Sequence, residues 1–299
     1  MMTEVDSFLK YIRYELNLSA HTVSAYKNDL LQFSEYICGT PDREPDSKSV
    51  TVNDIRSWVV DLAEHKTGAS SVRRKIQSLR AFFKWMQRRG RIENNPAMDV
   101  DLAKTPKRLP SWVREDVMDG ILAEPYDKSS LDEVRKHLIL TMFYETGIRR
   151  AELISLLDKD VDIPKGEIKV LGKRDKQRII PIGEGLEKEI SEYREMRNHD
   201  IGDTVEFFVR NDGKPLSPSF VYKIVNDALS SAGVEKRSPH VLRHTFASAM
   251  LNNGAEINSV KEILGHQSLA ATQIYTHITI SDLKLNYQQA HPRAIKKGG

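Results

Sequence analysis

The sequence contains very little cysteine and no long hydrophobic run. Cys38 is the only cysteine among 299 residues, so no disulfide can form within the chain. No apolar stretch approaches the roughly 18 residues that a membrane-spanning helix requires. The first ten residues contain acids where a secretory signal would place basic residues before an apolar core. We therefore expect a cytoplasmic protein that has no membrane partner and folds around its own core.

Acidic residues are missing from one long segment, although the chain as a whole is close to neutral. There are 45 Lys and Arg residues against 42 Asp and Glu residues, which gives a net charge of +3, yet residues 66–91 contain nine basic residues and no acid. Within residues 72–86 the apolar side chains recur every three or four positions, which predicts an amphipathic helix with a basic outer face. Solvated helices usually pair both charge signs. This face therefore favours contact with phosphate groups, and an ordinary solvated stripe is the alternative.

The pattern of apolar residues predicts a mainly helical protein with a small β-sheet. The first hundred residues show helical spacing throughout, and the pattern breaks at the proline-containing basic stretch before Pro110. Residues 167–171 and 178–182 flank a polar turn and predict a β-hairpin, with a third strand expected near residues 206–209. We therefore predict a helical domain over residues 1–101, a linker over 102–110 and an α+β domain over 111–299.

Three short clusters in the second domain contain residues suited to chemistry on an anion. They are YETGIRRAEL (144–153), HVLRH (240–244) and LGHQSLAATQIYTH (264–277). Pro239 predicts a helix start, which puts His240 and Arg243 one turn apart at a helix N-terminus, where a cationic pair is favoured when an anion binds. Taken singly, each cluster also fits an ordinary structural role: a buried histidine beside a surface arginine, a turn followed by a surface arginine pair, or an aromatic residue in a core.

A metal site is a further interpretation of the second cluster, because His240 and His244 are four residues apart, as in zinc-binding helices. No glutamate lies between them to act as a base, Arg243 would place a cation beside the metal, and no cysteine or third ligand completes the set. We therefore expect neither a metal nor another cofactor.

Taken together, the clusters resemble the signature of the tyrosine site-specific recombinase family, also called the phage integrase family. In that family an arginine follows a Thr-Gly turn, a His-x-x-Arg motif comes later, and a tyrosine lies nine residues after a Leu-Gly-His motif. The matching residues here are Arg149, His240, Arg243, His266 and Tyr275. The family's lysine lies in a hairpin turn, which matches Lys173 in LGKRDKQRIIPI, with Lys176 in the same turn. Ile148 and Ala151 replace the Leu and Ser that relatives often have.

The resemblance extends over nearly the whole chain, because residues 19–33 and 73–86 look like the family's N-terminal core-binding domain. It implies a helical SAM-like core-binding domain followed by an α+β catalytic domain. The last residues, 281–294, resemble the C-terminus of Xer recombinases, in which this helix contacts a neighbouring subunit. Leu283, Leu285 and Tyr287 are the anchors we expect, and packing of the helix on its own domain is the alternative.

The resemblance also implies a role for each site residue. Tyr275 would attack the scissile phosphorus and leave a 3′-phosphotyrosine and a free 5′-hydroxyl. Arg149 and Arg243 would hold the non-bridging oxygens, His240 would accept the phenol proton, His266 would donate a hydrogen bond to the phosphate, and Lys173 would protonate the leaving oxygen. One phosphodiester replaces another, so we expect the reaction to need no ATP.

The resemblance implies that the partner is double-stranded DNA and that the two domains hold it between them. The side chains expected to contact it lie on the basic helix and in the linker: Arg73, Arg74, Arg80, Lys84, Arg88, Lys104, Lys107 and Arg108. The Xer likeness implies chromosome-dimer resolution at a dif-type site through a Holliday junction. It also implies a homo- or hetero-tetramer on two sites, with a second Xer recombinase and a DNA translocase as further partners. The alternatives are the integrase of a mobile element, a type IB topoisomerase and a non-catalytic DNA-binding protein of the same fold.

Overall fold

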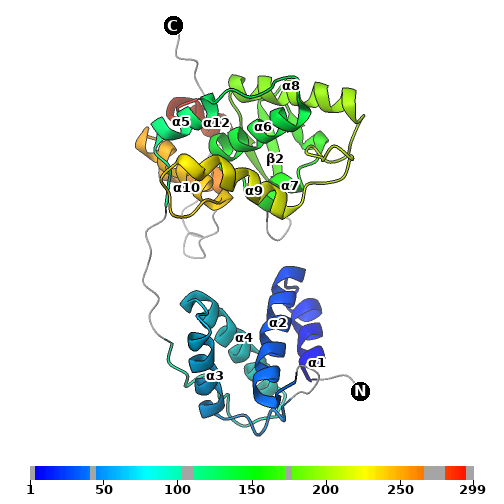
Figure 1. The fold of residues 1–299 in the computed structure, drawn as a ribbon, viewed down its shortest axis with the longest axis vertical. Coiled ribbons are helices and arrows are strands. Elements are labelled where there is room, and N and C mark those ends of the chain that lie inside the picture. Colours follow the sequence, from blue (N-terminus) through cyan, green and yellow to red (C-terminus); the bar gives the residue numbers. More distant parts are fainter. Residues whose placement is uncertain (1–3, 41–44, 103–110, 173–176, 266–279, 294–299) are drawn as a thin grey trace. The chain divides into compact units, whose positions relative to one another are not determined.

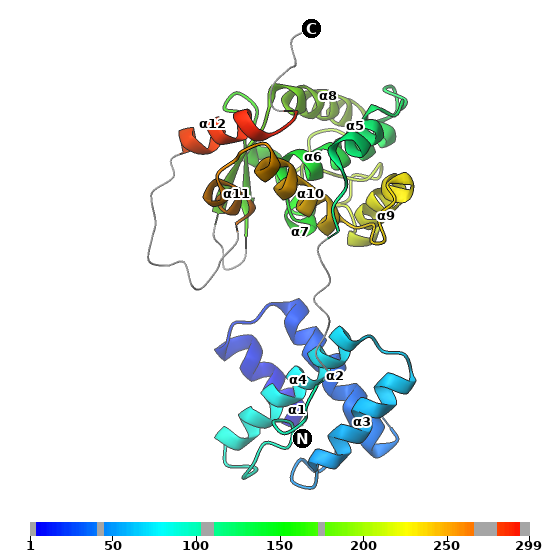
Figure 2. The same cartoon turned by 90° about the vertical axis from the view of Figure 1, so that its left-hand side faces the viewer.

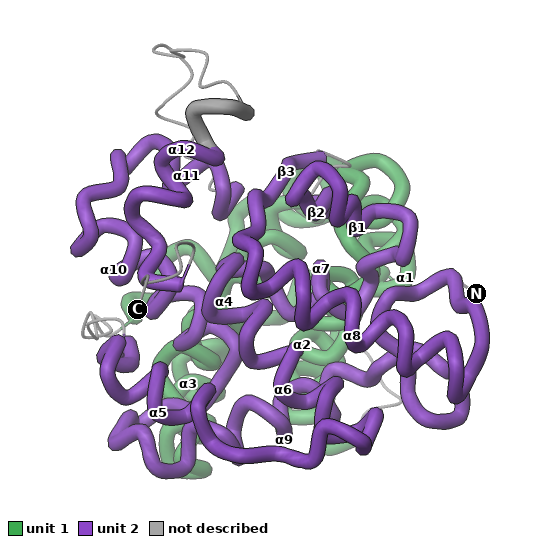
Figure 3. The backbone as a smooth tube through the Cα atoms, turned by 90° about the horizontal axis from the view of Figure 1, so that it is seen from above, with its two compact units in different colours: residues 1–108 green, residues 109–299 purple. Residues whose placement is uncertain are grey.

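The computed structural model describes residues 4–40, 45–102, 111–172, 177–265 and 280–293. The chain divides into two compact units, Met1–Arg108 and Leu109–Gly299, which Figure 3 colours separately. Each unit has its own cluster of buried apolar side chains. Within the described residues, no helix is both long enough and apolar enough to cross a bilayer.

Unit 1 is built from helices that pack around aromatic residues. They are α1 (Glu4–Lys10), extended by the π-helical turn Tyr11–Glu15, then α2 (Ala20–Cys38), α3 (Val52–Glu64) and α4 (Ala69–Arg88). The Ser19 hydroxyl accepts the Thr22 backbone N–H at the start of α2, which satisfies a donor that the helix itself leaves unpaired. Phe33 and Trp58 meet edge-to-face in the core. The apolar stripes read from the sequence are the faces that these helices bury.

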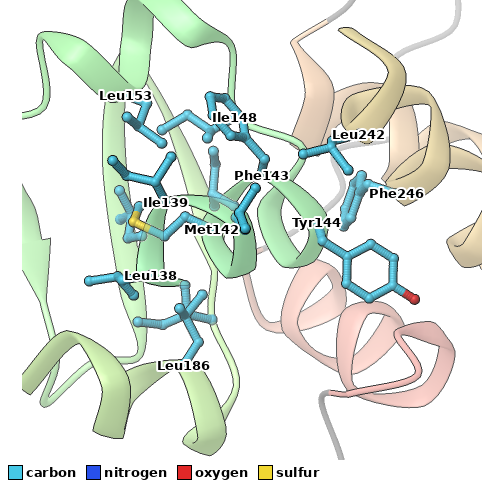
Figure 4. Packing of buried hydrophobic residues seen from close by; sticks show 14 of the residues in the cluster. Leu138, Ile139, Met142, Phe143, Tyr144, Ile148, Leu153, Leu186, Leu242 and Phe246 are labelled. Carbon is cyan, nitrogen blue, oxygen red and sulfur yellow. The ribbon is translucent and has the colours of Figure 1, made fainter. Parts of the chain in front are cut away.

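Unit 2 places a small sheet beside a group of helices, as Figure 1 shows. The helices are α5 (Glu115–Ala123), α6 (Leu131–Thr146), α7 (Arg150–Ile154), α8 (Glu184–Asp200), α9 (Pro218–Ala228), α10 (Pro239–Asn252), α11 (Ile257–Leu264) and α12 (Ile280–Ala290), with short 3₁₀ turns at Asp158–Asp160 and Leu229–Ser231. Helix α6 is buried on all sides from Leu138 to Thr146 and packs against α8 and α10. Figure 4 shows Phe143 of α6 near Leu242 and Phe246 of α10, so the core fixes α10 against the end of α6.

The sheet is antiparallel, in the order β1 (Val161–Asp162), β2 (Glu167–Leu171), β3 (Gln177–Pro181). The predicted hairpin is present, with Ile168 opposite Ile180. The third strand predicted near residues 206–209 is wrong, since that segment makes only isolated bridges, and the third strand is β1. Phe207, Phe208 and Val209 are all fully buried, so this apolar run fills the core without the alternation of a sheet strand. The two-residue β1 is too short to leave a pattern.

Helix α12 packs on its own unit, beside α10 and α11 (Figure 2). Tyr287 is completely buried, and Lys284 forms an ion pair of 2.8 Å with Glu167 of β2. After the helix, Arg293 pairs with the buried Glu145 at 3.1 Å. Of the anchors expected to reach a neighbouring subunit, Tyr287 is therefore used within the chain, Leu285 is exposed, and the side chain of Leu283 lies outside the described residues.

His291 follows α12 and is held in its neutral form. Its Nε2 lies 3.3 Å from the Tyr144 carbonyl, and its Nδ1 accepts the Arg293 backbone N–H at 3.2 Å, which requires the proton to be on Nε2 only. Burial, with a further contribution from Arg293, lowers the pKa of His291 to about 3. Burial also raises the pKa of Glu145 to about 8, against the opposing effect of Arg293. The docked end of the chain therefore favours a neutral His291 and a protonated Glu145.

These two groups give opposite pH dependences to folding stability. The contribution of neutral His291 is present above about pH 6.5 and is lost as the pH falls toward its folded pKa, because only the unfolded chain takes up the proton. The contribution of Glu145 is complete at low pH and is lost as the pH rises through its folded pKa of about 8. In the wild type, the pH dependences that His291 and Glu145 give to the unfolding free energy therefore offset each other in mildly acidic solution.

Replacing His291 with glutamine separates these contributions. We expect the gap in unfolding free energy between wild type and His291→Gln to be about 1.4 kcal/mol narrower at pH 5.5 than at pH 7.5, as one linked proton requires. Guanidinium unfolding at both pH values measures it, with the exposed His199→Gln as the matched control. A gap that does not change with pH would contradict the burial of a neutral imidazole.

Candidate active site

The site begins where α6 ends and α7 starts. Gly147 closes α6 in the left-handed conformation with φ of 59°, and Arg149 then forms the N-cap of α7. The Arg149 backbone N–H and its guanidinium donate to the two carboxylate oxygens of Glu152, at 2.8 and 2.7 Å. Glu152 is 5% exposed, so it holds Arg149 from the buried side while about a third of the Arg149 side chain faces solvent.

Arg243 approaches the same place from α10. Pro239 starts this helix after Ser238, as the sequence predicts, and Arg243 lies on its buried face. Its guanidinium donates to the Gly147 carbonyl at 2.6 Å and to the Leu264 carbonyl at the end of α11. Arg149 donates to the next carbonyl, that of Gly265, at 2.9 Å. The structure thus brings together the two arginines that the sequence places 94 positions apart.

A third arginine belongs to the cluster, and the sequence alone does not predict its part. Arg178 of β3 donates to both oxygens of Glu152, at 2.6 and 2.8 Å, and to the Ile263 carbonyl at 2.6 Å. In the sequence it is one of several cations around the hairpin turn. Its place inside the strand β3, after the turn, is the one signal that separates it from the turn residues.

The cluster has three cationic side chains and one carboxylate. Burial would raise the pKa of Glu152, but hydrogen bonds and charge interactions from Arg178 and Arg149 keep it below its ordinary value. Burial and then the neighbouring Arg149 and Arg178 lower the pKa of Arg243 to about 10, so it remains charged at neutral pH. The result is a fixed excess of positive charge that an anion would relieve.

His240 lies at the solvent-facing side of this cluster. Partial burial, then the charges of His244 and Arg150, followed by those of Arg243 and Arg149, lowers the pKa of His240 below its ordinary value. The ring is therefore neutral at pH 7 and can accept a proton. Arg150 and His244 themselves are exposed.

The other three expected site residues, Lys173, His266 and Tyr275, lie outside the described residues. Their neighbours in the chain are described. Strand β2 ends at Leu171 and strand β3 begins at Gln177, on either side of the segment that contains Lys173. Gly265, which directly precedes His266, is the left-handed C-cap of α11 and the hydrogen-bond partner of Arg149.

The basic residues expected on α4 divide into two groups. Arg74 pairs with the buried Asp29 of α2, and Arg80 donates to the carbonyls of Ala97 and Val100 at 3.0 and 2.9 Å. These contacts give both arginines a structural role within unit 1, and half of the Arg74 side chain remains exposed. For the other three, Arg73, Lys84 and Arg88, the side chains are also exposed. The linker residues Lys104, Lys107 and Arg108 lie outside the described residues.

Comparison with known proteins decides the family. The phage integrase family matches residues 111–281, and the N-terminal SAM-like domain of phage integrases matches residues 5–90. The chain belongs to the phage integrase family. This recombinase is 35% identical over 296 residues to the tyrosine recombinase XerC of Oceanobacillus iheyensis, covering 97% of this chain and 96% of that protein. XerC of Listeria monocytogenes is also 35% identical, over 96% of this chain and 97% of the relative.

These relatives make the protein a tyrosine recombinase of the Xer type, an enzyme that transfers DNA strands. Solved structures share the fold. The Tn1549 transposon integrase in complex with transposon right end DNA superposes with a TM-score of 0.71 at 20% identity, over 96% of this chain and 99% of that one. The structure of XerH bound to difH substrate gives a TM-score of 0.67 at 22% identity, over 95% of this chain and 82% of that one. The predicted fold class, a helical SAM-like domain with an α+β catalytic domain, is confirmed.

Proposed function

We propose that this recombinase cuts and rejoins DNA through a 3′-phosphotyrosine formed on Tyr275, with Arg149 and Arg243 holding the scissile phosphate. The observation that carries the proposal is the meeting of these two arginines at the carbonyl end of α11, directly before His266 in the chain. Each guanidinium has five N–H groups, and the backbone carbonyls and Glu152 use only some of them. The remaining donors of two rigid cations suit the non-bridging oxygens of a phosphodiester.

The chemistry follows from these groups. The Tyr275 oxygen attacks phosphorus, its proton passes to His240, and the bond from phosphorus to the 5′-oxygen breaks. Lys173 supplies a proton to that oxygen, and His266 donates to the phosphate. The neutral state of His240 suits the first transfer, since a phenol with an ordinary pKa near 10 needs a base to ionise. Rejoining is the reverse attack by a 5′-hydroxyl from the partner strand, so bond energy is conserved at each step.

The substrate and assembly we propose are those of a Xer recombinase acting in the cytoplasm. The chain resolves chromosome dimers at a dif-type site, through a Holliday junction, as a homo- or hetero-tetramer on two double-stranded DNA sites. A second Xer recombinase and a DNA translocase are the further partners, and α12 contacts the neighbouring subunit through the face it leaves exposed on its own unit, where Leu285 lies. The whole-chain similarity to XerC supports this function. The fold shared with the Tn1549 transposon integrase supports a mobile-element integrase as the second candidate.

A nicked suicide substrate tests the nucleophile. We expect wild-type protein to become covalently attached to a duplex that was selected for binding from a random library and nicked beside the cleavage position, because the nick lets the cut fragment leave. Tyr275→Phe lacks the attacking oxygen and should give no covalent complex. Tyr222→Phe, which changes an exposed tyrosine of α9, is the matched control and should react normally. A complex that persists in Tyr275→Phe would remove Tyr275 from this role.

The exposed basic residues of α4 should set part of the salt dependence of DNA binding. We expect Lys84→Gln with Arg88→Gln to weaken binding and to reduce the slope of log affinity against log salt by about 2, because each lost phosphate contact removes roughly 0.9. Fluorescence anisotropy with a labelled duplex at several salt concentrations measures the slope. The control, Lys128→Gln with Lys188→Gln, removes the same charge from exposed positions of unit 2. Equal slopes for both double variants would exclude α4 as a phosphate-contacting face.

A further inference from the structure

The C-terminal end of α11 collects three arginines from three different elements. Arg178 of β3 donates to the Ile263 carbonyl, Arg243 of α10 to the Leu264 carbonyl, and Arg149 of α7 to the Gly265 carbonyl. The last carbonyls of a helix have no partner within it and form the negative end of its dipole. Consecutive carbonyls therefore fix three cations in a set order at one point of unit 2.

Arg178 differs from the other two in what it contacts. Its planar guanidinium binds Glu152 through two nitrogens and the Ile263 carbonyl through a third, and the side chain is only 8% exposed. A bidentate contact with a carboxylate combined with a carbonyl contact is within reach of arginine and beyond the single ammonium of lysine. Arg178 is thus inaccessible to substrate but connects the hairpin, Glu152 and α11.

Glu152 transmits the effect of Arg178 to Arg149. The same Glu152 oxygen accepts from Arg149 at 2.7 Å and from Arg178 at 2.6 Å. If Arg178 is removed, this buried carboxylate keeps Arg149 as its single cationic partner among the residues that hydrogen-bond to it in the described structure. Arg149 would then be drawn inward to satisfy it, away from the Gly265 carbonyl and from the side where a phosphate would lie.

We propose that Arg178 is a positioning residue of the recombination reaction. By neutralising Glu152 and tying β3 to the end of α11, it keeps the Arg149 guanidinium turned toward the scissile phosphate. The assignment rests on the proposed function of Arg149, so its test includes a measurement that does not depend on catalysis. The close approach of Arg178 to Gly265, where an added Cβ would lie 3.0 Å from Arg178 Cδ, shows how tightly this link is packed.

The test compares variants on the same nicked suicide substrate. We expect Arg178→Met to slow covalent complex formation by about 100-fold, the size of effect that small misplacements of catalytic groups produce, with DNA affinity little changed because Arg178 is buried. Arg178→Lys should recover only part of the rate. Arg194→Met is the matched control, because Arg194 also binds a carboxylate and two carbonyls but does so at Asp158 and Val161. It should lower stability without slowing cleavage.

A second substitution distinguishes positioning from direct contact or simple destabilisation. Adding Glu152→Gln to Arg178→Met removes the anion that pulls Arg149 inward, and we expect the rate to rise about tenfold above that of Arg178→Met alone, within the range of couplings between contacting residues. A double variant slower than Arg178→Met, or equal slowing by Arg194→Met, would overturn the proposal.

Hydrogen exchange gives the measurement that is independent of activity. Arg178 and Arg149 both donate to carbonyls at the end of α11, so the peptide that ends at Gly265 should exchange faster in Arg178→Met than in wild type, and no faster in Arg194→Met. If the wild type does not cleave DNA but Arg178→Met still exchanges faster than wild type, the proposed function is refuted and the anchoring by Arg178 stands. Unchanged exchange together with a normal cleavage rate in Arg178→Met would refute Arg178 as a positioning residue and leave the proposed function intact.

Discussion

Replacing Arg243 with methionine is expected to slow formation of the covalent DNA complex by about 1000-fold, since removing one preorganised charge-stabilising donor costs 10²–10³ in rate. Two losses combine in this variant. The phosphate loses a cation, and the Gly147 and Leu264 carbonyls lose the donor that joins the end of α6 to the end of α11. A buried acceptor without a partner is destabilising by about 1–3 kcal/mol, so the folded state is weakened together with the site.

Arg243→Lys separates the two losses. The variant keeps the positive charge, but one ammonium replaces a fork that reaches two carbonyls and a phosphate. We expect it to fold and still to cleave about 100-fold more slowly, because the orientation of the charge is lost. Arg197→Met is the matched control for stability, since Arg197 is also buried and donates to Asp158 and to the Phe207 carbonyl. Single-turnover rates with saturating DNA measure the effect, and a rate for Arg243→Lys within threefold of wild type would place Arg243 away from the phosphate.

The sequence could predict the parts of this site that are specified locally. A Thr-Gly turn places Arg149 at the start of a helix, and Pro239 fixes the helix start that carries His240 and Arg243. The hairpin also follows from local pattern, because alternation and a polar turn are visible within about a dozen residues. The resemblance then joined these separate motifs into one site, which none of them specifies alone.

The parts that escaped prediction depend on contacts between distant segments. Nothing near Arg178 in the sequence shows that Glu152, 26 positions earlier, is its partner. The sequence of α4 predicts a basic face without acidic partners, because its own segment holds no acid, yet Asp29 of α2 pairs with Arg74 from 45 positions away. Arg80 is likewise used by backbone carbonyls of the segment after α4. Charge counting along the chain reveals the sign of a surface, and tertiary contacts decide which of its cations are available.

Gly147 is the position where a single added methyl group should have the largest effect on folding. Its φ of 59° is disfavoured for a residue with a Cβ, by about 1–2 kcal/mol. A Cβ there would also lie 2.5 Å from Phe246 Cδ1 and 2.7 Å from Leu264 Cδ2, closer than packed atoms come. Overpacking of this kind costs about 1–3 kcal/mol. We therefore expect Gly147→Ala to lower the unfolding free energy by about 3 kcal/mol, the sum of the two effects.

The same change should act on the arginines, because the neighbours that must move carry the site. Phe246 lies on α10 one turn after Arg243, and Leu264 supplies the carbonyl that Arg243 binds. We expect Gly147→Ala to cleave DNA about 100-fold more slowly even at a temperature where it is fully folded, because a displaced Arg243 no longer faces the phosphate. Gly233→Ala is the matched control, since Gly233 has a φ of 65° and open space around its missing Cβ. Gly233→Ala therefore measures the cost of the backbone conformation without any overpacking. If guanidinium unfolding gives both variants the same loss of stability, Phe246 and Leu264 yield to the methyl group, and Gly147 is required for its backbone conformation alone.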